Sequence, residues 1–217
     1  MRNLIRALAA GAMISALSLG LPGFAAAGPS TTTCTGVLAP GTYKKVVVPA
    51  GASCFSTGPV TIHNGVFVEA GATFVLGSEE APGDNGTISA GVHATDAANV
   101  QLHFVTINGG VDIHGGSGPF GPPFDVTWNT IEDSHVNGGV TITGYDGFWM
   151  GFIRNDVNGS VNLNDNVLVD PDGNEYVSNT IRGSLNCRGN SPAPQVGDSG
   201  GSPHRVTGAK TGQCANA

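Results

Sequence analysis

Residues 46–54 read VVVPAGASC, and residues 66–74, which begin 20 positions later, read VFVEAGATF. The two stretches share valines, an Ala-Gly-Ala turn and a hydroxyl-bearing residue in step, and they end on Cys54 and Phe74 respectively. A sequence motif repeated at this spacing is typical of solenoids, in which each repeat packs only against its neighbours. The two copies therefore predict a chain built of stacked repeats.

A less strict sequence motif continues the repeat toward the C-terminus. It reads Asn-x-Val/Ile-x-Gly followed by an apolar-polar-apolar triplet, as in NDVNG (155–159) before VNL and NTIRG (179–183) before LNC. The marker glycines are separated by 29, 21 and 24 residues, and they are Gly109, Gly138, Gly159 and Gly183. The longer spacings indicate insertions rich in turn residues, of which residues 115–123 (GGSGPFGPP) are the clearest.

This repeat predicts an all-β fold, a right-handed parallel β-helix of about seven to eight coils, on the repeat lengths typical of solenoids. Glycine contributes 34 of the 217 residues and charged residues only 12%, a composition poor in helix formers. Helical repeats need a 3.6-residue period, leucine-rich repeats need several leucines per turn, and a left-handed β-helix needs a strict hexapeptide; none of these patterns is present. The recurring Asn also suggests an amide ladder between coils. We expect one β-helix domain over residues 28–217.

The four cysteines allow three disulfide pairings, and we expect each end of the solenoid to be closed by its own pair. Cys34 and Cys54 lie 20 residues apart, and Cys187 and Cys214 lie 27 apart. Successive coils are separated by roughly 4.8 Å, and a disulfide needs Cα atoms about 4.4–6.8 Å apart. Stacked cysteines one coil apart can therefore bond, with Phe74 continuing the same inward column.

Residues 1–27 have the pattern of a secretory signal peptide, with a membrane anchor as the alternative. Arg2 and Arg6 precede an apolar stretch that ends at three alanines. Removal of this segment leaves 7 Lys and Arg against 16 Asp and Glu, a formal charge of −9. We therefore expect a secreted protein that has no membrane span after signal removal and does not bind nucleic acid, because phosphate binding needs a basic surface. An acidic polysaccharide would need a bridging cation.

Two blocks of sequence carry a resemblance to a known group of proteins. One is CTGVLAPGTY (34–43) continued to Cys54, and the other runs from GSLNCRGNSPAP (183–194) to TGQC (211–214). The chain resembles the small right-handed parallel β-helix proteins secreted by actinobacteria, which share their fold more distantly with pectate lyases. The resemblance implies the fold and export, and it implies little about activity because fold does not transmit function.

Acidic residues are concentrated in NDNVLVDPDGNE (164–175), where a calcium-dependent lyase would find its ligands. The candidate ligands in this stretch are Asp165, Asp170, Asp172 and Glu175. Alternating oxygen donors around a glycine are typical of calcium loops, although an Asp-Gly-Asn surface turn that joins two coils is the favoured explanation of the pattern. A hydrolase would need two facing carboxyl groups, and Glu132 and Asp133 are neighbours on a strand that point to opposite faces. The six histidines are interpreted as exposed polar residues rather than zinc ligands.

Aromatic residues are few, and they gather beside the insertion at residues 115–123. The candidate ligand-binding residues among them are Trp128, Tyr145, Phe148 and Trp149. Sugar rings stack on such side chains, whereas the simpler interpretation is that they fill the core below the insertion. We therefore expect a secreted, non-catalytic β-helix without a cofactor, either structural or binding a cell-wall or environmental polysaccharide. The alternative is a small calcium-dependent polysaccharide lyase or glycoside hydrolase.

Overall fold

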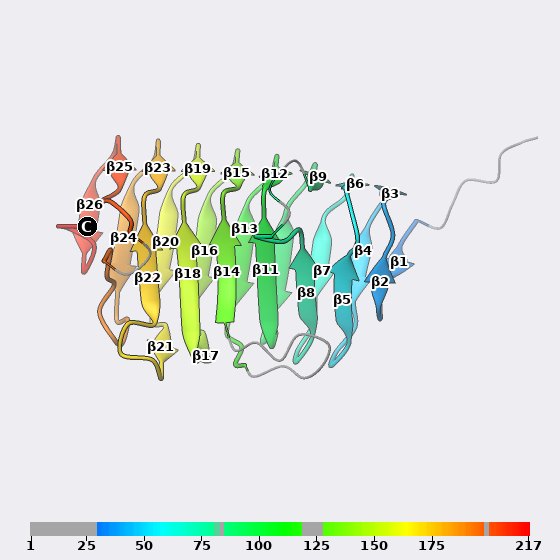
Figure 1. Cartoon of the computed structure of the whole chain (residues 1–217), viewed down its shortest axis with the longest axis horizontal. Coiled ribbons are helices and arrows are strands. Elements are labelled where there is room, and N and C mark those ends of the chain that lie inside the picture. Colours follow the sequence, from blue (N-terminus) through cyan, green and yellow to red (C-terminus); the bar gives the residue numbers. More distant parts are fainter. Residues whose placement is uncertain (1–29, 81, 83–84, 119–127, 198–199) are drawn as a thin grey trace, which may run out of the picture.

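The computed structural model describes residues 30–80, 82, 85–118, 128–197 and 200–217. These residues form 26 strands and no helix, and the strands stack in parallel into a rod (Figure 1). The expected signal peptide and residues 119–123 of the insertion lie outside the described residues. The all-β prediction is therefore confirmed, and three long sheets form the walls of the rod.

Sheet A is the nine-stranded wall. Its strands are β1 (Thr32–Thr33), β4 (Val46–Val48), β7 (Val66–Val68), β10 (Val92–Thr95), β13 (Val111–His114), β16 (Val140–Thr143), β20 (Val161–Asn164), β24 (Leu185–Arg188) and β26 (Lys210–Gly212). Sheet B has seven strands. They are β2 (Val37–Leu38), β5 (Ser53–Ser56), β8 (Thr73–Leu76), β11 (Asn99–His103), β14 (Trp128–Glu132), β18 (Trp149–Ile153) and β22 (Asn174–Val177).

Sheet C has eight strands. They are β3 (Gly41–Tyr43), β6 (Val60–Ile62), β9 (Gly86–Ile88), β12 (Val105–Ile107), β15 (His135–Val136), β19 (Asp156–Val157), β23 (Thr180–Ile181) and β25 (Arg205–Val206). A small fourth sheet pairs β17 (Asp146–Gly147) with β21 (Val167–Leu168) at the corner between sheets A and B. The eight strands of sheet C agree with the expected number of coils.

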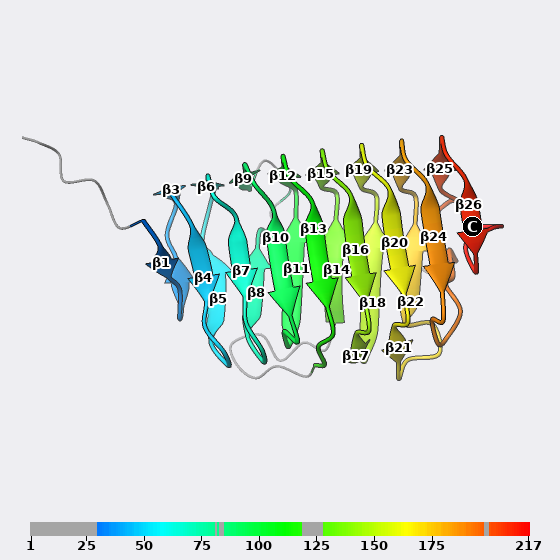
Figure 2. The same cartoon turned by 180° about the vertical axis from the view of Figure 1, so that it is seen from behind.

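Each coil runs through sheets A, B and C in that order, and the coil is right-handed. In Figure 1 the strands of sheet B rise on the near side while the chain advances from right to left. Figure 2, from behind, shows the strands of sheet A descending while the chain advances from left to right. Both views describe the same right-handed turn, as the repeat predicted.

The opening repeat marks equivalent positions in successive coils. Val46 pairs with Val66 across sheet A, and Cys54 pairs with Phe74 across sheet B. All four side chains are fully buried and belong to the continuous apolar core of the rod. The predicted inward column of Cys54 and Phe74 is therefore confirmed.

The marker glycines form a column at the corner between sheets C and A. The amide of Gly138 donates to the carbonyl of Gly109 at 2.8 Å, and that of Gly159 donates to Gly138 at 3.0 Å. A Cβ atom on Gly138 would lie only 2.5 Å from the carbonyl oxygen of Gly109. Since the backbones of successive coils approach too closely for any side chain here, the repeat requires glycine.

The recurring Asn residues form the expected ladder at the corner between sheets B and C. The amide of Ser134 donates to Oδ1 of Asn155 at 3.1 Å, and the amide of Asn155 donates to Oδ1 of Asn179 at 2.8 Å. His204 ends the ladder, because its Nδ1 accepts from the amide of Asn179 at 3.3 Å. The side chains thus satisfy buried backbone donors at the turns, where no strand partner is available.

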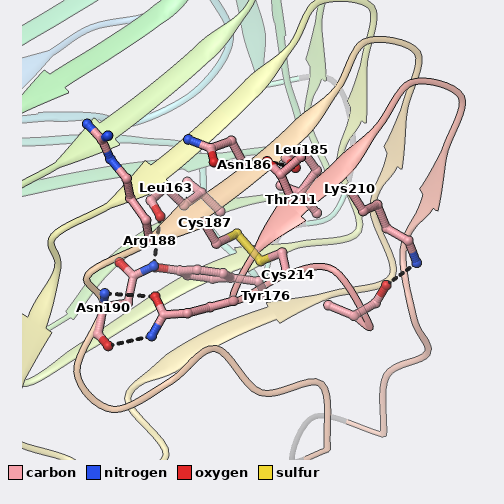
Figure 3. Close-up of a disulfide and its surroundings, with 12 residues drawn as sticks. Leu163, Tyr176, Leu185, Asn186, Cys187, Arg188, Asn190, Lys210, Thr211 and Cys214 are labelled. Atoms are coloured by element: carbon pink, nitrogen blue, oxygen red, sulfur yellow. Dashed lines mark hydrogen bonds between the residues drawn. A yellow bond between two sulfur atoms is a disulfide. The ribbon is translucent and has the colours of Figure 1, made fainter.

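Both disulfides have the expected pairing, Cys34 with Cys54 and Cys187 with Cys214. The expectation that the partners stack in register is wrong. Phe55 pairs with Val37, which places Gly36 rather than Cys34 beside Cys54, and Cys187 pairs with Gly212 rather than Cys214. Each bond is therefore diagonal, and Cα–Cα distances of 5.5 and 5.3 Å accommodate it. Figure 3 shows the second bond at the last coil.

Candidate functional site

The outer face of sheet B differs from an ordinary solvent-exposed face because most of its side chains are buried. Alternation along β11 and β14 points every second side chain outward. Outward residues that are nevertheless buried are Val75, Asn99, Gln101, His103, Thr130, Glu132, Ile153, Glu175 and Val177. Residues outside the strands contribute to this cover, since Glu79 contacts Glu132 and Gly201 packs on Val177. This face is where polar groups are held out of water.

Three aromatic side chains lie together at an exposed part of this face. Trp128 of β14 and Trp149 of β18 are paired in register, and their rings meet edge to face with centroids 6.4 Å apart. Trp128 is 39% exposed, and the adjacent Phe148 is 44% exposed. Large aromatic surfaces left open in this way are typical of ligand-binding positions rather than of core packing.

The aromatic group borders a cavity of about 330 Å³. Its lining residues are Glu79, Trp128, Glu132, Phe148, Trp149 and Asp170. A second hollow of about 600 Å³ continues along sheet B, where Glu79, His103 and Trp128 are among its walls. The two cavities share Glu79 and Trp128, so the aromatic rings and the buried polar groups belong to one site. We call it the sheet B site.

Glu132 is the most perturbed acid in the sheet B site. Burial, followed by a hydrogen bond with Glu79, raises the pKa of Glu132 to about 8. Thr130 Oγ1 donates to Oε1 of Glu132 at 2.5 Å, and Nη2 of Arg154 lies 3.3 Å from Oε2. Glu132 is therefore mainly protonated at neutral pH and shares a hydrogen bond with its neighbouring carboxyl group.

His103 lies next to this carboxyl pair, at the end of β11. It is only 4% exposed, and burial lowers its pKa, so its imidazole is neutral at neutral pH. Nε2 lies 3.5 Å from Oε1 of Gln101, while Nδ1 has no hydrogen-bond partner among the described residues. The expectation that all histidines are exposed is wrong for His103 and for His204, which is 6% exposed.

The four predicted ligand-binding aromatics divide into two groups. Trp128, Phe148 and Trp149 line the cavity of the sheet B site. Tyr145 lies in the core with no exposed surface, because its side chain turns inward at the corner before β17. Burial therefore removes Tyr145 from the surface that a ligand could reach.

The four predicted calcium ligands do not converge. Asp165 is exposed at the corner after β20, where its backbone is left-handed with φ 55°. Asp170 and Asp172 lie in the turn after β21, where Oδ1 of Asp170 accepts from the amide of Asp172 at 3.1 Å. Glu175 is buried on the outer face of sheet B. Within the described residues these four acids supply no cluster of three close ligands, and the turn has the local geometry of an Asx turn.

Glu132 and Asp133 diverge, as their adjacency predicted. Glu132 faces the sheet B site, whereas Asp133 sits at a left-handed corner and accepts two hydrogen bonds of 2.7 Å from Arg154. Neither Glu79 nor His103 was predicted as a site residue from the sequence. The available signal was the alternation in NVQLH (99–103), which places Asn99, Gln101 and His103 on one outward row.

Comparison of the chain with protein-family models, with curated proteins and with solved structures found no match. Among the residues that the structure describes, none belongs to a helix with the length and hydropathy to cross a membrane. The two disulfides are compatible with an extracellular protein. Functional inference therefore depends on the chemistry of the sheet B site.

Proposed function

We propose that the protein is a secreted, non-catalytic β-helix that binds a glycan at the sheet B site. The observation that carries this proposal is the exposed group of Trp128, Phe148 and Trp149 at the edge of a cavity that also contains carboxyl groups. Aromatic faces stack on the C–H faces of sugar rings, and polar groups beside them fix the hydroxyls. A cavity of about 330 Å³ accommodates part of a chain rather than a large macromolecule.

The charge of the chain favours a neutral glycan. Without residues 1–27 the formal charge is −9, and Glu79, Glu132 and Asp170 all line the cavity. An acidic polysaccharide would be repelled unless a cation lay between the two. A neutral polymer is therefore the first ligand to test.

Export is part of the same proposal. Its support is the signal-peptide pattern of residues 1–27 together with two disulfides and no free cysteine among the described residues. The cysteine blocks at the two ends also support a relationship with the small secreted β-helix proteins of actinobacteria. In this setting an environmental or cell-wall polysaccharide is the partner that the protein would meet.

Catalysis has less support than binding. Glu79 and Glu132 are joined by a hydrogen bond, whereas the carboxyl groups of glycosidases stand about 5–10 Å apart to flank the bond that they cleave. The acids Asp165, Asp170, Asp172 and Glu175, which a calcium-dependent lyase would need, form no group of three close ligands within the described residues. Binding is therefore the better supported of the two proposals.

Retention on insoluble polysaccharides tests the proposal. We expect the protein to be retained on at least one neutral polysaccharide in a panel of neutral and acidic polymers, and Trp149→Ala to weaken the affinity at least tenfold. Loss of one stacked ring corresponds to about 1–3 kcal/mol, by analogy with base stacking on aromatic side chains. Circular dichroism and the melting temperature would show that the variant is folded.

The matched control is Phe67→Ala on the outer face of sheet A. Phe67 is also half-exposed, stacks on His93 with ring centroids 5.3 Å apart, and has Nζ of Lys45 4.1 Å from its centroid. This variant should be retained like the wild type. Equal retention of both variants, or no retention on any polymer, would contradict glycan binding at the sheet B site.

A further inference from the structure

Three side chains from successive coils converge beneath the cover of sheet B. Glu79 follows β8, and His103 and Glu132 end β11 and β14, where they are paired in register. One ligand atom from each, a ring nitrogen and two carboxylate oxygens, lie within 4.8 Å of one another. Among the described residues this is the one group of three potential ligands with such spacing.

The unsatisfied nitrogen of His103 is an independent sign that something binds here. His103 is only 4% exposed, and its Nδ1 has no hydrogen-bond partner within the described part of the chain. Leaving such a buried group unpaired destabilises the folded state. A bound cation would satisfy the nitrogen and both carboxylates at once.

We propose that Glu79, His103 and Glu132 form a binding site for a divalent transition-metal ion of the Zn²⁺ type. Such ions take imidazole nitrogen and carboxylate oxygen at about 2.0–2.2 Å. Calcium prefers six to eight oxygen ligands, so the imidazole selects against it. None of the candidate calcium ligands Asp165, Asp170, Asp172 and Glu175 belongs to this group of three.

The neighbouring charges and hydrogen bonds suit this assignment. Thr130 donates to Oε1 of Glu132 and Arg154 lies beside Oε2, so both hold the carboxyl group in place while lone pairs remain for a metal. The charge of Arg154 is already offset by Asp133, with which it makes two hydrogen bonds of 2.7 Å. With the metal bound, the two glutamates are ionised and balance its double positive charge.

Three protein ligands leave at least one coordination position open. Glu79 and Glu132 also line the cavity that contains Trp128 and Trp149, so a metal held by them would lie beside the aromatic residues. Water or an oxygen of a bound ligand can occupy the open position. The metal site does not depend on glycan binding, because the three ligands come from the chain alone.

Calorimetric titration of the chelator-treated mature protein with Zn²⁺ alone tests the inference. We expect one saturable site, an increase in melting temperature, and no comparable signal with Ca²⁺. Glu79→Gln is the key variant, because Glu79 is exposed and its replacement leaves the core intact. It should weaken Zn²⁺ binding at least tenfold, and His103→Gln should do the same if it remains folded.

The control is His114→Gln, which alters an exposed pair on sheet A whose Nε2 lies 2.9 Å from Oδ1 of Asp112. This variant should bind Zn²⁺ like the wild type. Absence of saturable Zn²⁺ binding, or binding that is lost in His114→Gln and retained in Glu79→Gln, would overturn the assignment. Neither result would alter the retention of the protein on polysaccharide, so the two proposals can fail separately.

Discussion

The outer faces of sheets A and B are built on the same alternation, yet they have opposite environments. On sheet A the outward side chains other than Asn164 are at least partly exposed, and they include Val47, Phe67, His93, Asp112, Thr141, Asn162, Asn186 and Thr211. On sheet B the corresponding row of Gln101, Thr130 and Glu175 is buried. The strand alternation is the same in both sheets, so it does not determine which face holds a site. The difference comes from the residues outside the strands that cover sheet B.

This difference explains why perturbed groups gather on one side. Sheet A follows a short corner of Gly and Ser residues, and its outward polar side chains remain in contact with water. On sheet B, residues outside the strands cover the outer face, because Glu79 contacts Glu132 and Gly201 packs on Val177. Water is excluded from Glu132 and His103, and burial is the largest cause of the pKa shift of each.

We expect the largest difference between the two faces when a lysine is introduced on each and the free energies of unfolding are compared. Val177 is an outward residue of sheet B that is 1% exposed beneath Gly201, so Val177→Lys buries an unpaired ammonium group. We expect the free energy of unfolding to fall by about 4 kcal/mol. The measurement is urea unfolding followed by circular dichroism.

The matched substitution is Asn162→Lys on the outer face of sheet A. Asn162 is partly exposed, and the expected change is within about 0.5 kcal/mol. If both variants lost the same stability, the two faces would be equivalent, and the residues that cover sheet B would not make the burial of a charge there more costly.

The histidine at the end of the Asn ladder should give a smaller, pH-dependent effect. Burial, with a lesser effect from Lys210, lowers the pKa of His204 from 6.5 to about 4. The folded state therefore holds His204 neutral, and the unfolded state binds its proton first as the pH falls. This stabilisation is complete above pH 6.5 and is lost between pH 6.5 and about 4, with a magnitude on the order of 3 kcal/mol.

Asn is the informative replacement at this position, because it does not titrate and continues the ladder of Asn155 and Asn179. Urea unfolding of the wild type and of His204→Asn should be compared at pH 7 and at pH 4.5. The wild type should lose more stability than the variant on acidification. Identical pH dependence in the two proteins would show that His204 remains free to protonate in the folded state.

The sequence predicted those features that recur once per coil. Cys54 and Phe74 share a column, the marker glycines stack, and Asn155 and Asn179 form a ladder, because a fixed backbone geometry imposes the same residue at each turn. The diagonal disulfides were not predicted. Sequence separation alone does not reveal that Cys34 lies two residues before the position in register with Cys54.

The sheet B site was predicted only in part, for a physical reason. Trp128 and Trp149 could be selected from the sequence because aromatic residues are few in this chain and are concentrated near the insertion. Glu79, His103 and Glu132 are separated by 24 and 29 residues, so insertions of unequal length hide their alignment. Their burial also depends on segments that cross the sheet, which no local pattern encodes.

The most direct test of the central claim uses the tryptophans themselves. The chain contains two, Trp128 and Trp149, and both lie in the sheet B site, so intrinsic tryptophan fluorescence reports on this site alone. Titration with soluble oligosaccharides of a retaining polysaccharide should produce a saturable change in emission, equally in the wild type and in Phe67→Ala. Unchanged emission, with the protein still retained on that polysaccharide, would place the glycan elsewhere and contradict the account.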